Sequence, residues 1–102
     1  MTHLALVIRH RTRPGKRNEV RSIWENYLMQ AIAGNPGHLS YVYSFDNNDP
    51  DGICIFMQYA NEEAMQDFLK TASYTVYLAA IQPLLLGSPE VAVLTPLWSK
   101  KD

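Results

Sequence analysis

The order of strand and helix patterns predicts an α+β fold in which helices cover one face of a four-stranded antiparallel sheet. Four segments have the alternation and β-branched content of strands, namely 4–12, 38–45, 53–59 and 90–97. Stretches with the apolar spacing of helices separate the first strand from the second and the third from the fourth. The resulting β-α-β-β-α-(α)-β order is the ferredoxin-like arrangement, or split βαβ motif.

Length and composition indicate one globular unit. The chain has 102 residues, of which 47% are hydrophobic, so we expect a single domain over residues 1–102. Nine Lys and Arg against ten Asp and Glu give a net charge of -1, which argues against a nucleic-acid-binding protein with its basic surface. The single Cys54 excludes an internal disulfide and a cysteine-based zinc site, and we expect no metal site.

The N-terminal region carries no targeting pattern. Its apolar stretch runs only from Leu4 to Ile8, which is too short for a signal peptide or a membrane span. We therefore expect a cytoplasmic protein that does not contact membranes.

The first strand and helix follow from periodicity. Segment 4–12 is apolar on both alternating faces, and the turn at Arg13-Pro14-Gly15 ends it. Helical spacing then predicts one helix from about Lys16 to Ala33, and Gly34 ends it. The inner stripe of this helix is Val20, Ile23, Trp24, Tyr27 and Ala31.

The central strands are joined by a polar loop at 46–52. Segment 53–59 is apolar on both faces, whereas segment 38–45 has one apolar and one more polar face. The apolar face of segment 38–45 holds Leu39, Tyr41, Tyr43 and Phe45.

The last third of the chain predicts two short helices and a strand. Asn61 is an expected N-cap for a helix over 62–71, and a second helix over about 74–86 follows a break near Ala72-Ser73. Pro83 lies inside that second helix and predicts a kink or an early end. The final strand over 90–97 is again apolar on both faces.

Three strands that are apolar on both faces predict self-association. Helices on one side of the sheet leave the other side exposed, and burial of apolar surface stabilises by about 25 cal/mol per Å². We therefore predict a homodimer in which the free sheet faces pack together around a two-fold axis.

Several short motifs occur in order along nearly the whole chain. They are Arg13-Pro14-Gly15-Lys16, Asn35-Pro36-Gly37, Tyr41–Ser44, Asp49-Pro50-Asp51, the run from Tyr59 to Ala64, and Ile81-Gln82-Pro83-Leu84. In this order and spacing the chain resembles the antibiotic biosynthesis monooxygenase (ABM) family, within the dimeric α+β barrel superfamily. The resemblance implies a small dimer with one pocket per subunit between sheet and helices. It also implies oxidation of a small phenolic or quinol-like aromatic molecule by O2, with no metal, flavin or other cofactor.

A cofactor-free oxygenase needs a proton acceptor, a group that stabilises the substrate anion, and a dry aromatic pocket. His10 follows the phase of Leu6 and Ile8 and is the candidate base if that face meets the helices; the alternative is a partly exposed histidine at a strand end. Tyr59 is the second catalytic candidate, since its hydroxyl can bond to a substrate oxygen; the alternative is a core tyrosine.

The candidate substrate-binding residues are aromatic side chains, and the alternative for each is ordinary core packing. They are Trp24, Tyr43, Phe68 and Tyr77. Tyr59 and Phe68 stand where many members of the resembled family have Trp and His. Two further functions therefore stay open: a non-catalytic dimeric binding or accessory module, and a small-molecule isomerase of the same fold.

Overall fold

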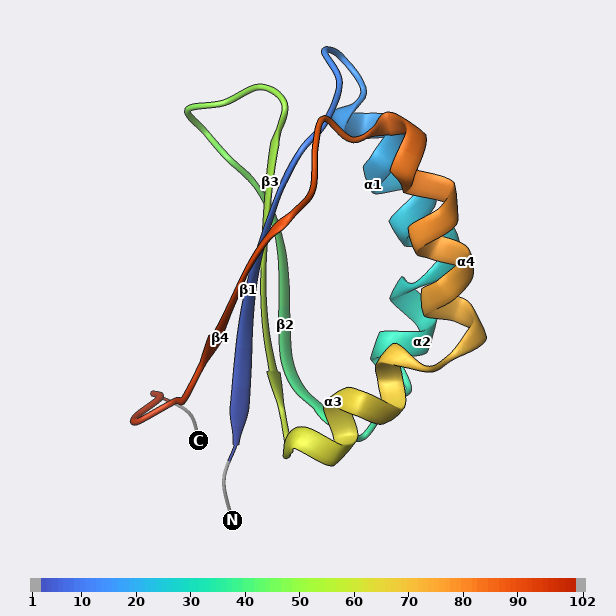
Figure 1. Ribbon diagram of the computed structural model, residues 1–102. Coiled ribbons are helices and arrows are strands. Elements are labelled where there is room, and N and C mark those ends of the chain that lie inside the picture. The colour runs from blue at the N-terminus through green and yellow to red at the C-terminus, as the bar shows by residue number, and fades with distance from the viewer. Residues whose placement is uncertain (1–2, 101–102) are drawn as a thin grey trace.

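The computed structural model describes residues 3–100 and has all helices on one side of a twisted sheet (Figure 1). The four strands pair antiparallel in the order β2-β3-β1-β4, which confirms the predicted α+β ferredoxin-like class. The elements are β1 (Leu4–Arg11), α1 (Arg17–Tyr27), α2 (Met29–Ala33), β2 (His38–Phe45), β3 (Gly52–Tyr59), α3 (Glu62–Leu69), α4 (Ala72–Ile81), the 3-10 turn η1 (Gln82–Leu84) and β4 (Glu90–Leu94).

The helical segment after β1 is broken, whereas a single helix was predicted. The backbone leaves helical geometry at Leu28, where φ is -120° and ψ is -32°. This local unwinding shifts the inner stripe by one position, so that Leu28 and Ile32 are buried while Tyr27 is 47% exposed. The predicted place of Tyr27 on the inner stripe is therefore wrong.

The second helical pair begins and ends at residues with clear capping chemistry. The Asn61 side chain accepts a hydrogen bond from the Ala64 backbone N–H at 2.8 Å and caps α3, as predicted. Thr71 caps α4 in the same way through the Tyr74 N–H, so the break comes slightly earlier than expected. The α4 helix stops at Ile81, which confirms the early end predicted from Pro83.

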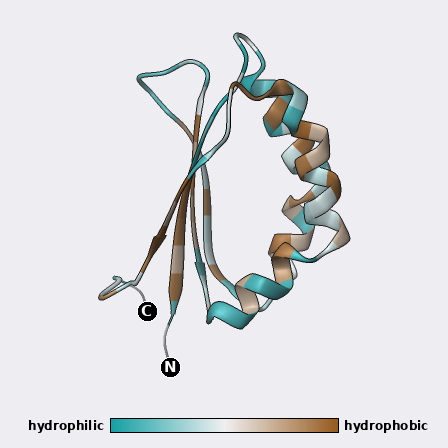
Figure 2. Cartoon of the chain, in the orientation of Figure 1, coloured by the Kyte–Doolittle hydropathy of each residue, from teal (hydrophilic) through white to brown (hydrophobic). Residues whose placement is uncertain are grey.

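Alternation along β1 decides which side chains meet the helices. Leu6 and His10 are buried on the helix side, whereas Arg9 and Arg11 point to the open face and are exposed. Figure 2 shows apolar residues along β1 and β4 as well as in the helices. The core therefore lies between one sheet face and the helices, and apolar residues remain on the other face.

Strand β2 contains an irregularity that changes the predicted alternation. His38 pairs with Tyr59 and Ser40 pairs with Gln58, so Leu39 lies in a bulge between two regular pairs. Leu39 is 40% exposed and does not share the buried face of Tyr41, contrary to the prediction. Strand β4 ends at Leu94, three residues before the predicted end at Leu97. Within residues 3–100, every helix is too short or too polar to cross a lipid bilayer.

Candidate functional site

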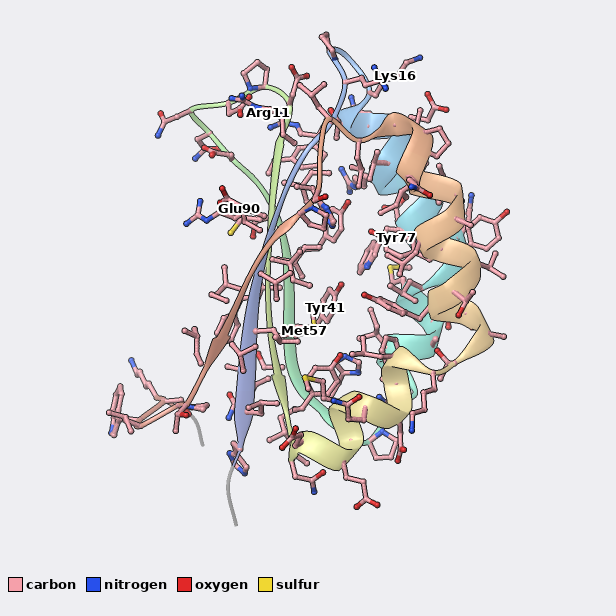
Figure 3. All side chains as sticks on the ribbon, viewed as in Figure 1. Arg11, Lys16, Tyr41, Met57, Tyr77 and Glu90 are labelled. Carbon is pink, nitrogen blue, oxygen red and sulfur yellow. The ribbon has the colours of Figure 1, made fainter. Side chains whose placement is uncertain are left out.

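A cavity of about 300 Å³ lies between the inner face of the sheet and helices α3 and α4. Figure 3 shows Tyr41 and Met57 of the sheet pointing toward the helices, and Tyr77 of α4 pointing toward the sheet. The lining consists mainly of apolar side chains, with one histidine and four tyrosines as polar members. The residues are Leu6, Ile8, His10, Leu28, Tyr41, Ile55, Met57, Tyr59, Met65, Phe68, Leu69, Tyr74, Tyr77, Leu78, Pro89, Val91 and Val93.

His10 projects into this cavity from β1, because it follows Leu6 and Ile8 in the strand alternation. It is 7% exposed, and its Nδ1 has no hydrogen-bond partner among the described residues. Burial lowers the pKa of His10 below its ordinary value of 6.5, so the imidazole is neutral at neutral pH. His10 is therefore a buried, uncharged group with a free nitrogen, and not a partly exposed strand-end histidine.

The cavity tyrosines are all hydrogen-bond donors at neutral pH. Burial raises the pKa of Tyr41, Tyr59, Tyr74 and Tyr77 above the ordinary value of 10. Tyr59 lies at the end of β3 and is 1% exposed. Its hydroxyl stays protonated, so Tyr59 can donate to a ligand oxygen and cannot act as a base near pH 7.

The predicted binding residues divide into two layers. Phe68 and Tyr77 line the cavity together with His10 and Tyr59, whereas Trp24 and Tyr43 lie outside its lining. The Trp24 ring stacks on Tyr43 with ring centres 4.4 Å apart. The Trp24 Nε1 donates a hydrogen bond of 3.2 Å to the hydroxyl of Tyr41. Trp24 and Tyr43 thus support the cavity wall from behind and do not face a ligand directly.

His38 forms part of the same supporting layer. Its ring lies 4.4 Å from that of Tyr59 and 4.6 Å from that of Phe68, measured between ring centres. The Asn35 Oδ1 accepts from the Gly37 backbone N–H, so the Asn35 amide nitrogen is the donor in the 2.9 Å contact to His38 Nδ1. This pairing assigns the hydrogen of neutral His38 to Nε2. Burial lowers the pKa of His38 to about 4, in keeping with a neutral ring.

Sequence reasoning missed the cavity residues of β4 and of the outer part of α4. Val91 and Val93 have the alternation of a strand. That alternation does not predict which strand the helices leave uncovered, so it could not place these two residues at the cavity. Tyr74 and Leu78 flank Tyr77 on α4, and both line the cavity. In the sequence, their spacing of four residues was the one sign that they lie on the same face of the helix. Among residues 3–100, no group of three or more His, Cys, Asp or Glu side chains is placed to hold a metal ion.

Known structures support the fold described above. A protein from Chloroflexus aurantiacus J-10-fl, of the antibiotic biosynthesis monooxygenase type, is 26% identical, with a TM-score of 0.84 and 98% of each chain covered. Rv0793 from Mycobacterium tuberculosis is 22% identical, with a TM-score of 0.87 and coverage of 98% of this chain and 100% of the other. SnoaB, a cofactor-independent oxygenase from Streptomyces nogalater, is 14% identical, with a TM-score of 0.83 over the full length of both chains. The last two likenesses show the fold alone.

The sequence comparisons point to one family. A search of the curated proteins gives no match. The family model described as antibiotic biosynthesis monooxygenase matches residues 4–80, which is more than half of the sequence. The chain therefore belongs to the antibiotic biosynthesis monooxygenase family.

Proposed function

We propose that the protein is a cofactor-independent monooxygenase that oxidises a small phenolic or quinol-like aromatic molecule with O2. The observation that carries this proposal is His10, a buried neutral imidazole with an unpaired nitrogen in an apolar, aromatic cavity. A cavity of this kind excludes water from a reactive anion and holds a flat ring by apolar contacts. Membership of the ABM family and the similar fold of SnoaB, a cofactor-independent oxygenase, are consistent with it.

In the proposed reaction, His10 takes the phenolic proton and leaves a substrate phenolate. The phenolate transfers one electron to O2, and the resulting substrate radical and superoxide combine at a ring carbon that carries hydrogen. The peroxide anion then recovers the proton from His10. Loss of water from the hydroperoxide leaves a carbonyl on the ring, so one oxygen atom enters the product and the other leaves as water.

Tyr59 has a separate task in this scheme. A phenol has a pKa of about 10, so proton transfer to His10 is uphill and the anion needs support. Tyr59 pairs with Leu4 and His10 pairs with Ile53, so six residues of strand, about 20 Å, separate their Cα atoms and the two side chains cannot share one substrate oxygen. The protonated Tyr59 hydroxyl can instead donate a hydrogen bond to a second oxygen of a quinol-like substrate, at the other end of the cavity. Phe68 and Tyr77 are then the ring-contacting residues, while Trp24 and Tyr43 hold the wall in place.

The test is oxygen uptake by purified, metal-free protein with 1-naphthol, anthrone or a quinol. We expect His10→Gln to lower kcat/KM by about 10²–10⁴-fold, because it removes the base. Tyr59→Phe should lower it by about tenfold or less, because it removes one hydrogen bond at the end of the cavity away from His10. His3→Gln is the matched control, since His3 is an exposed histidine outside the cavity. Uptake no faster than the spontaneous rate in the absence of protein would remove the enzyme claim.

The other two functions are outcomes of the same experiment. Thermal stabilisation by these aromatics without turnover indicates the non-catalytic binding or accessory module. Turnover that persists under nitrogen indicates an isomerase, because an isomerase needs a base and no oxygen.

We further propose that the protein acts as a homodimer joined through the open sheet face. An uncharged row crosses all four strands there, from Val42 through Phe56 and Val7 to Ala92. Val42 is 51% exposed and Phe56 is 37% exposed, although both lie in the sheet. The segment after β4 leaves the sheet on the side away from the helices (Figure 1), and it carries Leu97 and Trp98, which are 92% and 81% exposed. A second copy would cover the row and this segment together.

A further inference from the structure

The cavity has a broad mouth at the β4 edge of the sheet. Val91 and Val93 line the cavity from β4, yet they are 56% and 61% exposed. Their partners on β1 are less exposed, since Leu6 is buried and Ile8 is half-buried. Leu78 of α4 also lines the cavity and is 40% exposed. We refer to Leu78, Val91 and Val93 as the lip.

A second hollow continues the mouth along α4. It lies between α4 and the segment that returns to β4, and it shares His10, Tyr74, Leu78 and Pro89 with the cavity. His10 therefore lies where the cavity and this hollow meet. A molecule that crosses the lip therefore reaches the free imidazole from the β4 side of the cavity.

Neither the lip nor the cavity carries a charge at neutral pH. In the described chain, no cavity-lining residue is Asp, Glu, Lys or Arg. His10 is neutral and the four tyrosines are protonated, for the reason of burial given above. Charged residues lie near the lip on the open face of the sheet: Glu90 points to that face (Figure 3) and pairs in register with Arg9, and both line a separate hollow that also reaches His10.

We propose that ligands enter across the lip, and that lip and cavity together admit uncharged aromatic molecules and reject ionised ones of the same size. An ionised group in this cavity would lose its hydration and find no countercharge, and that loss is large for a carboxylate. This inference rests on the proposed function, because it takes the cavity to be the ligand site. The lip lies on the helix side of β4, so a second copy on the open face would leave it accessible.

The test uses a pair of competitors that differ in charge. N-phenyl-1-naphthylamine, an uncharged dye that fluoresces in apolar surroundings, reports occupation of the cavity in the full-length protein at neutral pH. We expect 1-naphthol to displace the dye, and 1-naphthoate, whose carboxylate is ionised, to need a concentration at least about tenfold higher. Equal competition by the two compounds would overturn the charge selection.

Two lip variants test the entrance itself. Leu78→Trp should slow dye association several-fold in stopped-flow measurements, because the larger ring narrows the mouth. Val76→Trp is the matched control, since Val76 is on the same helix, is 47% exposed and does not line the cavity. Leu78→Arg should bring the two competitors closer together, because it places a countercharge at the mouth. Equal association rates in the two Trp variants, or an unchanged competitor ratio in Leu78→Arg, would show that the lip is not the selective entrance.

The two proposals can fail separately. If 1-naphthol stabilises the protein and is oxidised, but naphthoate competes equally, only the entrance and its charge selection are wrong. If neither the dye nor 1-naphthol binds, the cavity is not a ligand site, and both proposals are wrong.

Discussion

At the scale of single residues, burial decides the charge state of the groups around the cavity. His10 and His38 lose hydration on folding, and no carboxylate contacts either ring among the described residues, so the neutral forms are favoured. The cavity tyrosines keep their protons for the same reason. The site therefore offers one proton acceptor, His10, among several hydroxyl donors.

The lowered pKa of His38 leads to a prediction of how the free energy of unfolding depends on pH. Its pKa in the folded protein is about 4, against an ordinary value of 6.5, so between these values the unfolded chain binds a proton that the folded protein does not. The free energy of unfolding should therefore fall as the pH falls from about 6.5 to about 4. In His38→Asn, urea unfolding at the two ends of this range should show a smaller pH effect than in the wild type.

The control for this measurement is His3→Gln, which replaces an exposed histidine and leaves His38 in place. Other groups, among them His10, titrate in all three proteins, so only the difference between slopes is diagnostic. A slope in His38→Asn as steep as that of the wild type would show that His38 is not held neutral by the fold.

At the scale of elements, close contacts between segments distant in sequence position the strands that carry the site. The Arg17 guanidinium at the start of α1 donates to the backbone carbonyls of Asp46 and Asp49 in the β2–β3 loop and of Gly52 at the start of β3, at 2.8 to 3.1 Å. It also lies 4.0 Å above the ring of Phe45. One cation thereby holds the loop that joins β2 to β3.

The contact between the start of β2 and α3 gives a sharper prediction. A Cβ on Gly37 would lie 2.9 Å from the Cβ of Ala64, which is fixed to the helix backbone and cannot rotate away. Gly37→Ala should therefore destabilise the protein by about 1–3 kcal/mol, as overpacking of a fitted contact does. The free energy of unfolding from urea titration measures this loss.

The matched background is Ala64→Gly, which removes the atom that would clash. Ala64→Gly alone should cost about 1 kcal/mol through lost helix propensity. In that background the added cost of Gly37→Ala should largely disappear. Simple additivity of the two substitutions would mean that the clash is not what makes glycine necessary at position 37.

At the scale of the whole molecule, the two faces of the sheet carry different features. Its helix side encloses the cavity, and its open side carries the apolar row defined by Val42, Phe56, Val7 and Ala92. Obligate dimers usually bury more than about 2,000 Å², an area that a four-stranded face can supply only when most of it is covered. The open face is therefore the natural place for a second copy.

Sedimentation velocity measures this prediction directly. The wild type should sediment as a dimer at micromolar concentration, and Phe56→Lys should shift it to a monomer, because a lysine in the row buries an unpaired charge. Val76→Lys is the control, since Val76 is exposed on α4, on the helix side of the molecule. A wild type that remains monomeric would remove the dimer proposal and leave the cavity proposals untouched.

The sequence predicted the position of His10 in the site but not that of Trp24. The phase of His10 along 4–12 placed it with Leu6 and Ile8, and the structure places these three side chains on the cavity lining. In the sequence, Trp24 looked equivalent to Phe68 and Tyr77 because all three are aromatic candidates for substrate binding. Its hydrogen bond to Tyr41 and its stacking on Tyr43 set it behind the wall, and both contacts depend on how α1 sits on β2.

The sequence by itself determined the order of elements, the antiparallel α+β class and the alternation that sends His10 and Arg9 to opposite faces of β1. These properties depend on local periodicity and turn chemistry, which neighbouring residues specify. Only the tertiary structure decided that the backbone unwinds at Leu28, that Trp24 lies behind the cavity, and that β4 extends beyond the cover of the helices with Val91 and Val93 at an open mouth. Those outcomes depend on the packing of helices against the sheet, a balance among contacts between distant segments that no local pattern contains.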